Sequence, residues 1–365
     1  QLRGWLAARY LAVGRDFRFG KGRGGDDDGH CGLVPGGHLD ACERCGYEHP
    51  SYNSCRNRHC PKCQALAQEQ WIAAQRARML DVSHFHVVFT LPAQLRPLAA
   101  YAPRETYAAL FACAAATLRA FGDRRLSATL GATLVLHTWT RELELHPHVH
   151  AIVTAGGLAH DGASWVSTRR RFLFPVKALS RVFRGKMRDA LRKLYRGGAF
   201  AGFDDFEDPQ AFDVLLRRIA QLSWHVYAKP SFSRGEHVLK YLGRYTHRVG
   251  LANSRILAVS DDAVTLRTRG RDSVTLPPVE FLHRFVQHVL PEGFHKIRHV
   301  GLYANKRLVA RAAELTGAPR LLPDFASNLR ERLLLLTGRD IALCPHCAAP
   351  LTTLPLARAP PGAAA

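Results

Sequence analysis

The sequence predicts an α+β fold built around an antiparallel sheet, and three observations support this class. Short β-rich runs are interspersed with longer segments that have helical periodicity. These runs do not follow the regular strand–helix–strand alternation that is typical of parallel sheets. The chain shows no internal repeat, and its 365 residues with 47% hydrophobic content suffice for two or three domains.

The expected elements follow in order along the chain. The Gly- and Asp-rich stretch 20–38 predicts a flexible loop. Helical periodicity predicts helices at 64–80, 104–121, 176–196 and 235–248, the third of them basic and amphipathic. Strands are expected at 84–92, 132–140, 148–156 and 223–230, and a hairpin at 254–260 and 263–269. Residues 276–365 are expected to be mostly helical, with a disordered Pro/Ala-rich tail.

The charge balance indicates a polyanionic partner. Lys and Arg total 51 against 30 acidic residues, a net charge of +21, and Arg suits bidentate contacts to phosphate. Nucleic acid is therefore the favoured partner, with a ribosome- or membrane-surface protein, or free Arg usage in a high-GC genome, as alternatives. No run reaches the ~18 apolar residues of a membrane helix, and no signal segment opens the chain. We expect a cytoplasmic protein.

The cysteines predict a zinc site. Nine cysteines, an odd number, argue against a secreted disulfide framework. Two CxxC pairs, Cys42/Cys45 and Cys60/Cys63, are spaced to form a tetrahedral Cys₄ zinc site. Two spare donors in the same segment could replace a pair member or help to hold a second ion; they are Cys55 and His59. A second CPHC motif, Cys344 to Cys347, is either half of a site completed elsewhere or has no metal role.

The stretch HPHVH, residues 146–150, predicts a second metal site. On a strand His148 and His150 project from the same face, where they could chelate a divalent cation with a third ligand from elsewhere. His146 has the same parity, but Pro147 leaves its direction open. The alternative is a hydrogen-bonded or solvated pair of histidines without a metal.

The predicted helix 235–248 carries two tyrosines at helical spacing. His237, Tyr241 and Tyr245 recur every fourth residue and would lie along one face. A neighbouring stripe of cations consists of Lys240, Arg244 and Arg248. The two phenols beside these cations could attack a phosphate; the alternative is an amphipathic helix with half-buried tyrosines.

Together these motifs carry a family resemblance. A His-hydrophobic-His strand followed by a Tyr-x-x-x-Tyr helix resembles the HUH endonuclease superfamily. The motifs SCRNRHCPKC, FHVVFTLP, HPHVHAIVTAGG, VYAKP and VLKYLGRYTHRV occur in that order. Over about residues 40–270 they resemble the zinc-binding rolling-circle transposases of the insertion sequence ninety-one type.

The resemblance implies a reaction and roles for residues. It implies an HUH-type DNA transposase with Mg²⁺ or Mn²⁺ on His148 and His150 and a structural Zn²⁺. Tyr241 and Tyr245 would form 5′-phosphotyrosine links, and Arg244 and Arg248 would neutralise the phosphate. The third metal ligand is expected to be His237, with Glu236 next and His146 as a further possibility. Because Mg²⁺ prefers oxygen ligands, an all-imidazole site would favour Mn²⁺ or another transition metal.

The same resemblance implies three parts and a substrate. We expect a zinc-binding module at 1–80, an HUH catalytic domain at 81–275 and a helical C-terminal region at 276–365. The substrate would be single-stranded DNA at transposon ends and target. Bases could stack on Trp139, Trp165, Trp224 or Tyr227, but packing in the core or the sheet is the favoured interpretation for each. The rival functions are a rolling-circle replication initiator or relaxase, and a non-catalytic zinc protein that binds nucleic acid.

Overall fold

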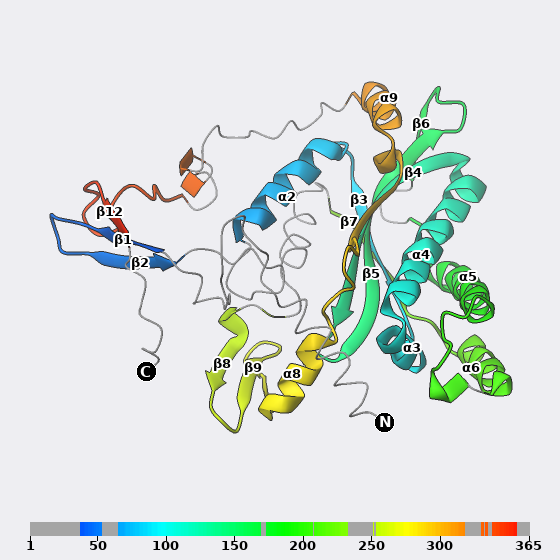
Figure 1. Cartoon of the computed structure of the whole chain (residues 1–365). Coiled ribbons are helices and arrows are strands. Elements are labelled where there is room, and N and C mark those ends of the chain that lie inside the picture. The colour runs from blue at the N-terminus through cyan, green and yellow to red at the C-terminus, as the bar shows by residue number, and fades with distance from the viewer. Residues whose placement is uncertain are drawn as a thin grey trace. The chain divides into compact units, whose positions relative to one another are not determined.

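The computed structural model describes residues 37–52, 65–168, 173–206, 208–232, 251, 253–317, 330–331, 333–334 and 338–355. The chain forms two compact units (Figure 1). One comprises residues 1–73 with 324–365, and the other comprises residues 74–323. Helix α2 (Ala65–Arg78) contains the boundary between them.

The larger unit is built on a six-stranded antiparallel sheet of order β11-β4-β5-β3-β7, with β6 paired to β5. Its strands are β3 (His84–Thr90), β4 (Ala128–Trp139), β5 (Leu145–Ala159), β6 (Trp165–Ser167), β7 (Val226–Phe232) and β11 (Ile297–Gly301). The α+β class predicted from the sequence is confirmed. The two central strands are longer than predicted, because β4 and β5 remain paired as far as Ala128 and Ala159.

Helices cover one face of this sheet (Figure 1). They are α3 (Arg96–Tyr101), α4 (Pro103–Leu126), α5 (Val176–Arg196) and α6 (Pro209–Gln221). Alternation along β3 shows which residues face them, since Phe85, Val87 and Phe89 belong to the same buried cluster as the helix residues. The residues between them, among which is His86, project from the opposite face. We call this opposite face the histidine face.

Helix α5 shows how the sequence specifies this packing. Leu179, Phe183, Met187 and Leu191 recur every fourth residue and are fully buried, which gives the helix one apolar stripe. The ring of Phe183 lies 5.1 Å from that of Phe89 on β3. The predicted bounds, 176–196, agree with the observed helix.

A second, smaller sheet has the order β10-β9-β8. Its strands are β8 (Ile256–Val259), β9 (Val264–Arg267) and β10 (Ser273–Leu276). The predicted hairpin corresponds to β8 and β9, which pair antiparallel. Helix α8 (Pro278–Val286) packs Phe281 and Phe285 against the small core of this sheet.

The unit that contains both chain ends holds a three-stranded sheet of order β12-β1-β2. Its strands are β1 (Gly37–Ala41), β2 (Glu48–Tyr52) and β12 (Thr352–Pro355). The expected C-terminal region is thus distributed over both units. Helix α8, strand β11 and helix α9 (Lys306–Thr316) belong to the larger unit, whereas β12 belongs to the smaller one.

The remaining described elements are short 3₁₀ turns. They are η1 (Ala93–Leu95), η2 (Asp204–Phe206), η3 (Asn253–Arg255) and η4 (Leu302–Ala304). The predicted helix 235–248 and almost all of the predicted loop 20–38 lie outside the described residues. Among the residues that are described, no helix has both the length and the apolar character needed to cross a membrane.

Candidate metal centres

Three imidazoles meet on the histidine face of the large sheet. His137 on β4 is the direct cross-strand partner of His148 on β5, and His150 follows two residues later on the same face. One ring nitrogen from each of the three residues lies within 4.8 Å of the others. The ring centroids of His137 and His150 are 4.2 Å apart. Three convergent imidazoles are a suitable donor set for a divalent transition metal.

Burial keeps these imidazoles neutral at physiological pH. Burial lowers the pKa of His148 to about 4. It also holds the pKa of His137 and of His150 well below the ordinary range, and neighbouring imidazoles add to the effect in both cases. A metal binds the neutral form of imidazole, so the cluster does not need to lose protons before it can act as a ligand set.

Hydrogen bonds orient two of the three rings. Nδ1 of His148 donates to the backbone carbonyl of His146 at 2.6 Å, which leaves Nε2 of His148 with its lone pair. Nδ1 of His150 lies 2.7 Å from Nε2 of His86 on β3, and the two rings are stacked. When His150 is the donor in this pair, its Nε2 is likewise available to a metal. Such partners fix the tautomer and raise the basicity of a ligating histidine.

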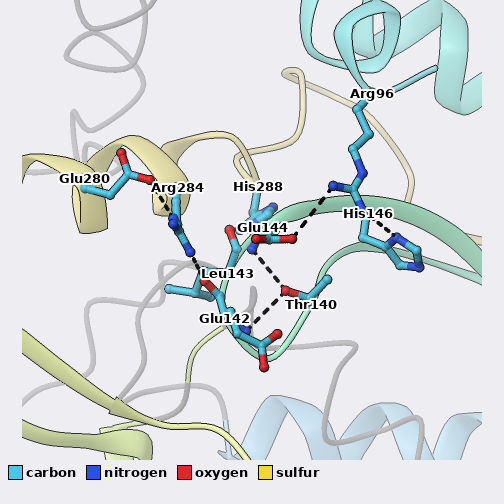
Figure 2. A network of polar contacts seen from close by, with 9 residues as sticks. All are labelled: Arg96, Thr140, Glu142, Leu143, Glu144, His146, Glu280, Arg284 and His288. Carbon is cyan, nitrogen blue, oxygen red and sulfur yellow. Dashed lines mark hydrogen bonds and ion pairs between the residues drawn. The ribbon is translucent and has the colours of Figure 1, made fainter. Parts of the chain in front are cut away.

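The turn between β4 and β5 sets the register of the cluster and is anchored from helix α8 (Figure 2). The hydroxyl of Thr140 accepts hydrogen bonds from the backbone amides of Glu142 and Glu144, each at 3.2 Å. Arg284 on α8 donates to the carbonyl of Glu142 at 3.0 Å. The side chain of Leu143 is fully buried although its φ is 60°. Hydrogen bonds to its backbone and the burial of Leu143 therefore both hold the turn in place.

His146 lies beside Arg96, which extends from α3 (Figure 2), and its ring centroid is 5.2 Å from that of His148. Its Nδ1 lies 3.5 Å from a guanidinium nitrogen of Arg96, which also approaches Glu144 at 3.7 Å. Within the described part of the chain, the imidazole that joins His148 and His150 is that of His137. The sequence reasoning missed His137. The signal that the sequence offered was a histidine within the neighbouring predicted strand, residues 132–140.

His288 makes the fold sensitive to acid, because it is buried and binds the β4–β5 turn as a neutral ring. Its Nε2 donates to the carbonyl of Leu143 at 3.0 Å, and Nδ1 lies 3.2 Å from the hydroxyl of Thr138. Burial lowers the pKa of His288 to about 4, against 6.5 for the unfolded chain, and the bond to Leu143 opposes this only in part. The stability that this ring contributes is therefore complete above pH 6.5 and is lost as the pH falls toward 4.

We expect His288→Gln to flatten this dependence, because glutamine can donate to Leu143 but does not titrate. Urea unfolding of the wild type and the variant at pH 7 and pH 4.5 measures the effect. The wild type should lose up to about 3 kcal/mol more than the variant over this interval. Parallel losses in the two proteins would show that His288 does not titrate on unfolding.

The predicted helix 235–248 is not among the described residues. Its predicted site residues, His237, Tyr241, Arg244, Tyr245 and Arg248, lie outside the described residues, as does Glu236. Their roles stay predictions.

The four aromatic residues considered for base stacking differ in exposure. Trp224 is buried, and its indole donates to the carbonyl of Ile219 at 2.8 Å, so it belongs to the core. Trp139 and Trp165 are half-buried. Tyr227 on β7 is 42% exposed. Val88 is the cross-strand partner of both Tyr227 and His150, so Tyr227 projects from the histidine face.

A separate cluster of four cysteines lies in the smaller unit. It consists of Cys42, Cys45, Cys344 and Cys347, whose sulfur atoms all lie within 4.8 Å of one another. The first pair was predicted to bind zinc, and the second was the CPHC motif without an assigned partner. The other predicted donors, Cys55, His59, Cys60 and Cys63, lie outside the described residues.

Comparisons with known proteins match regions of the chain that contain the histidine cluster and the first half of the cysteine cluster. A family model described as "Putative transposase" matches residues 131–310, and one described as "Transposase zinc-binding domain" matches residues 29–91. The first match contains the three clustered histidines, and the second contains Cys42 and Cys45. No solved structure matches the chain.

Two curated relatives are similar over most of the chain. "Putative transposase y4qJ" of Sinorhizobium fredii (strain NBRC 101917 / NGR234) is 40% identical over 86% of this chain and 83% of the relative. "Transposase for insertion sequence element IS801" of Pseudomonas savastanoi pv. phaseolicola is 33% identical over 70% of this chain and 62% of the relative. The motifs, the two family matches and these relatives agree. The chain belongs to the zinc-binding transposases of the insertion sequence ninety-one type.

Proposed function

We propose that this transposase nicks and rejoins single-stranded DNA through a covalent 5′-phosphotyrosine intermediate during rolling-circle transposition. The observation that carries the proposal is the convergence of His137, His148 and His150 at one point on an otherwise well-packed sheet. His137 and His150 are buried and His148 is half-buried, and a bound cation would account for the convergence of their ring nitrogens.

The imidazole cluster fits a divalent cation. His148 and His150 are the ligands expected from the sequence, and His137 supplies the third nitrogen. An all-nitrogen set favours Mn²⁺ or another transition metal over Mg²⁺, which prefers oxygen. A bound cation would polarise the scissile phosphate as a Lewis acid. His237 stays a further candidate ligand from the sequence.

The chemistry at the DNA is a pair of transesterifications. The Tyr241 hydroxyl attacks phosphorus and loses its proton, the bond from phosphorus to the 3′ oxygen breaks, and that oxygen leaves as a 3′ hydroxyl. A 5′-phosphotyrosine keeps the phosphodiester free energy, so a 3′ hydroxyl can later reverse the reaction and reseal a strand without ATP. Tyr245 would act on the second junction while Tyr241 holds the first. Arg244 and Arg248 would neutralise charge on the phosphate oxygens.

The family resemblance and the charge support this substrate. The resemblance implies single-stranded DNA, and the net charge of +21 supports binding to a polyanionic backbone. The exposed ring of Tyr227 on the histidine face is positioned to stack a base, an interaction worth about 1–3 kcal/mol.

Mapping of the covalent link tests the proposal. Labelled single-stranded DNA from the ends of the element is incubated with the full chain and Mn²⁺, and the linked peptide is identified by mass spectrometry. We expect a link at Tyr241 or Tyr245 and no link in the variant that carries both Tyr241→Phe and Tyr245→Phe. Duplex DNA of the same sequence is the control for strandedness.

The rival functions predict different products. A non-catalytic zinc protein would give no adduct under any of these conditions. A replication initiator or relaxase would give the adduct and would rejoin the nicked strand without moving a segment into a target. An adduct that persists in the double tyrosine variant would overturn the assignment of the nucleophiles.

A further inference from the structure

We propose that one zinc ion is held by Cys42, Cys45, Cys344 and Cys347, so that the C-terminal segment completes the zinc-binding module. Neither family match assigns this role, because Cys344 and Cys347 lie beyond residues 29–91 and beyond residues 131–310. The inference concerns the smaller unit and does not depend on the proposed DNA chemistry.

The sulfur positions fit a tetrahedral zinc. Sγ of Cys42 lies 3.5 Å from Sγ of Cys347, and Sγ of Cys45 lies 3.5 Å from Sγ of Cys344. Ligands at the usual zinc–sulfur distance of about 2.3 Å are separated by roughly 3.8 Å along a tetrahedral edge. Disulfide bonding would need about 2.05 Å, so these four thiols are not disulfide-bonded.

The two CxxC segments have the same backbone fold. The amide of Cys42 donates to the carbonyl of Tyr47 at 2.8 Å, and the amide of Gly46 donates back to Cys42 at 2.9 Å. The amide of Cys344 donates to Ala349 at 2.8 Å, and that of Ala348 donates back to Cys344 at 2.9 Å. In each segment the backbone of the first cysteine is therefore hydrogen-bonded to the fourth and fifth residues after it.

The fourth residue after each first cysteine adopts the left-handed conformation. Gly46 has φ 72°, which suits glycine, and Ala348 has φ 56°. An alanine is rarely found in this region and carries a local cost there. That Ala348 nevertheless adopts this conformation indicates that the surrounding structure holds the backbone of the second segment in the same turn as the first. The two segments together resemble two equivalent halves of one tetrahedral site.

A backbone amide is directed at one of the four sulfurs. The amide of His346 donates to Sγ of Cys344 at 3.4 Å. A thiolate rather than a thiol is the zinc ligand, and an N–H donor stabilises the charged sulfur.

Strand pairing brings the two halves together. Residues 38–41 of β1 pair antiparallel with residues 352–355 of β12. Two side-chain hydrogen bonds support this pairing, from Thr353 to Asp40 at 3.0 Å and from Thr352 to Glu43 at 3.4 Å. Both Cys42 and Glu43 directly follow β1, so the pairing carries the C-terminal segment to the first CxxC turn.

Four thiolates fill a tetrahedral coordination shell, so this ion has no position left for Cys60 or Cys63. The proposal therefore differs from the assignment in which Cys42/Cys45 and Cys60/Cys63, the two CxxC pairs that are near in the sequence, share one zinc ion. The two assignments predict opposite results when one pair of cysteines is removed and the reactivity of another pair is measured.

Thiol alkylation of the zinc-loaded full chain, read by mass spectrometry, tests the proposal. With Cys42→Ser and Cys45→Ser, we expect alkylation of Cys344 and Cys347 to accelerate about tenfold or more, because thiols released from zinc become reactive. With Cys60→Ser and Cys63→Ser, the matched control, Cys344 and Cys347 should stay protected. Cys113, buried in the core of the larger unit, is the internal reference for global unfolding.

A second pair of variants keeps the test decisive if the double variants lose structure. Cys347→His retains a zinc ligand and should keep Cys344 protected, whereas Cys347→Ser should expose it. Zinc content measured by atomic absorption should fall by one equivalent in the serine variant only. The proposal is overturned if Cys344 and Cys347 stay protected without Cys42 and Cys45, or if only the loss of Cys60 and Cys63 exposes them.

Discussion

Replacing His137 by alanine should lower the rate of Mn²⁺-dependent nicking of single-stranded DNA about a hundredfold or more. A metal contributes several kcal/mol to charge stabilisation in a transition state, and a loss of ~3 kcal/mol corresponds to roughly a hundredfold in rate. His137 faces His148 directly across the β4–β5 pair, so its removal takes away one of three convergent nitrogens. Nicking rates measured over a range of Mn²⁺ concentrations report the effect.

The concentration series also separates metal binding from folding. The affinity for Mn²⁺, followed by electron paramagnetic resonance, should fall together with the rate in His137→Ala. The matched control is His160→Ala, because His160 is an exposed histidine that bonds to Asp123 at 3.1 Å, outside the cluster. A His137→Ala protein with normal Mn²⁺ affinity and a normal rate would show that His137 is not a ligand.

Gly301→Ala should destabilise the larger unit by about 3 kcal/mol or more, through backbone strain together with overpacking. Gly301 ends β11 with φ 59° and ψ −128°, a conformation that is essentially restricted to glycine. A Cβ at this position would overlap the backbone carbonyl oxygen of Leu130. Because the obstacle is backbone, relief requires the end of β11 to move away from β4.

Gly293→Ala is the matched control for this variant. Gly293 has φ 66°, but a Cβ there would meet no atom within 4 Å. It should therefore lose only about 1–2 kcal/mol from the left-handed conformation. Urea unfolding of both variants gives the two losses. Equal losses in the free energy of unfolding would mean that β11 can move away from Leu130 without destabilising the protein, and that this close approach is not important for stability.

Local patterns in the sequence predict much of the large unit. The apolar stripe of α5 predicts a helix that packs one face on the core, and the alternation in β3 and β5 predicts which side chains face the helices. The end of β5 was harder to predict, because Gly156 and Gly157 suggest a turn. The strand continues through both and pairs with β6, where a Cβ on Gly156 would lie 2.7 Å from Nε1 of Trp165. The glycine is needed for this close approach.

The histidine cluster and the cysteine cluster show why the rest could not be predicted. Parity along a strand places His148 and His150 on one face, but it does not say which residue of another strand lies opposite. That register depends on the β4–β5 turn, whose anchor Arg284 is far away in the sequence. In the same way, the spacing within each CxxC motif predicts half of a zinc site, and only the tertiary structure selects the partner half.

The pairing of β1 with β12 has a consequence for biosynthesis. Cys42 and Cys347 are separated by 305 residues, so a ribosome that has added Cys42 must translate that whole interval before Cys347 exists. At about 5–20 residues per second this delay is roughly 15–60 s. On the nascent chain β1 therefore stays without β12, and a transcript truncated before the codons of β12 would yield a polypeptide that never closes this sheet.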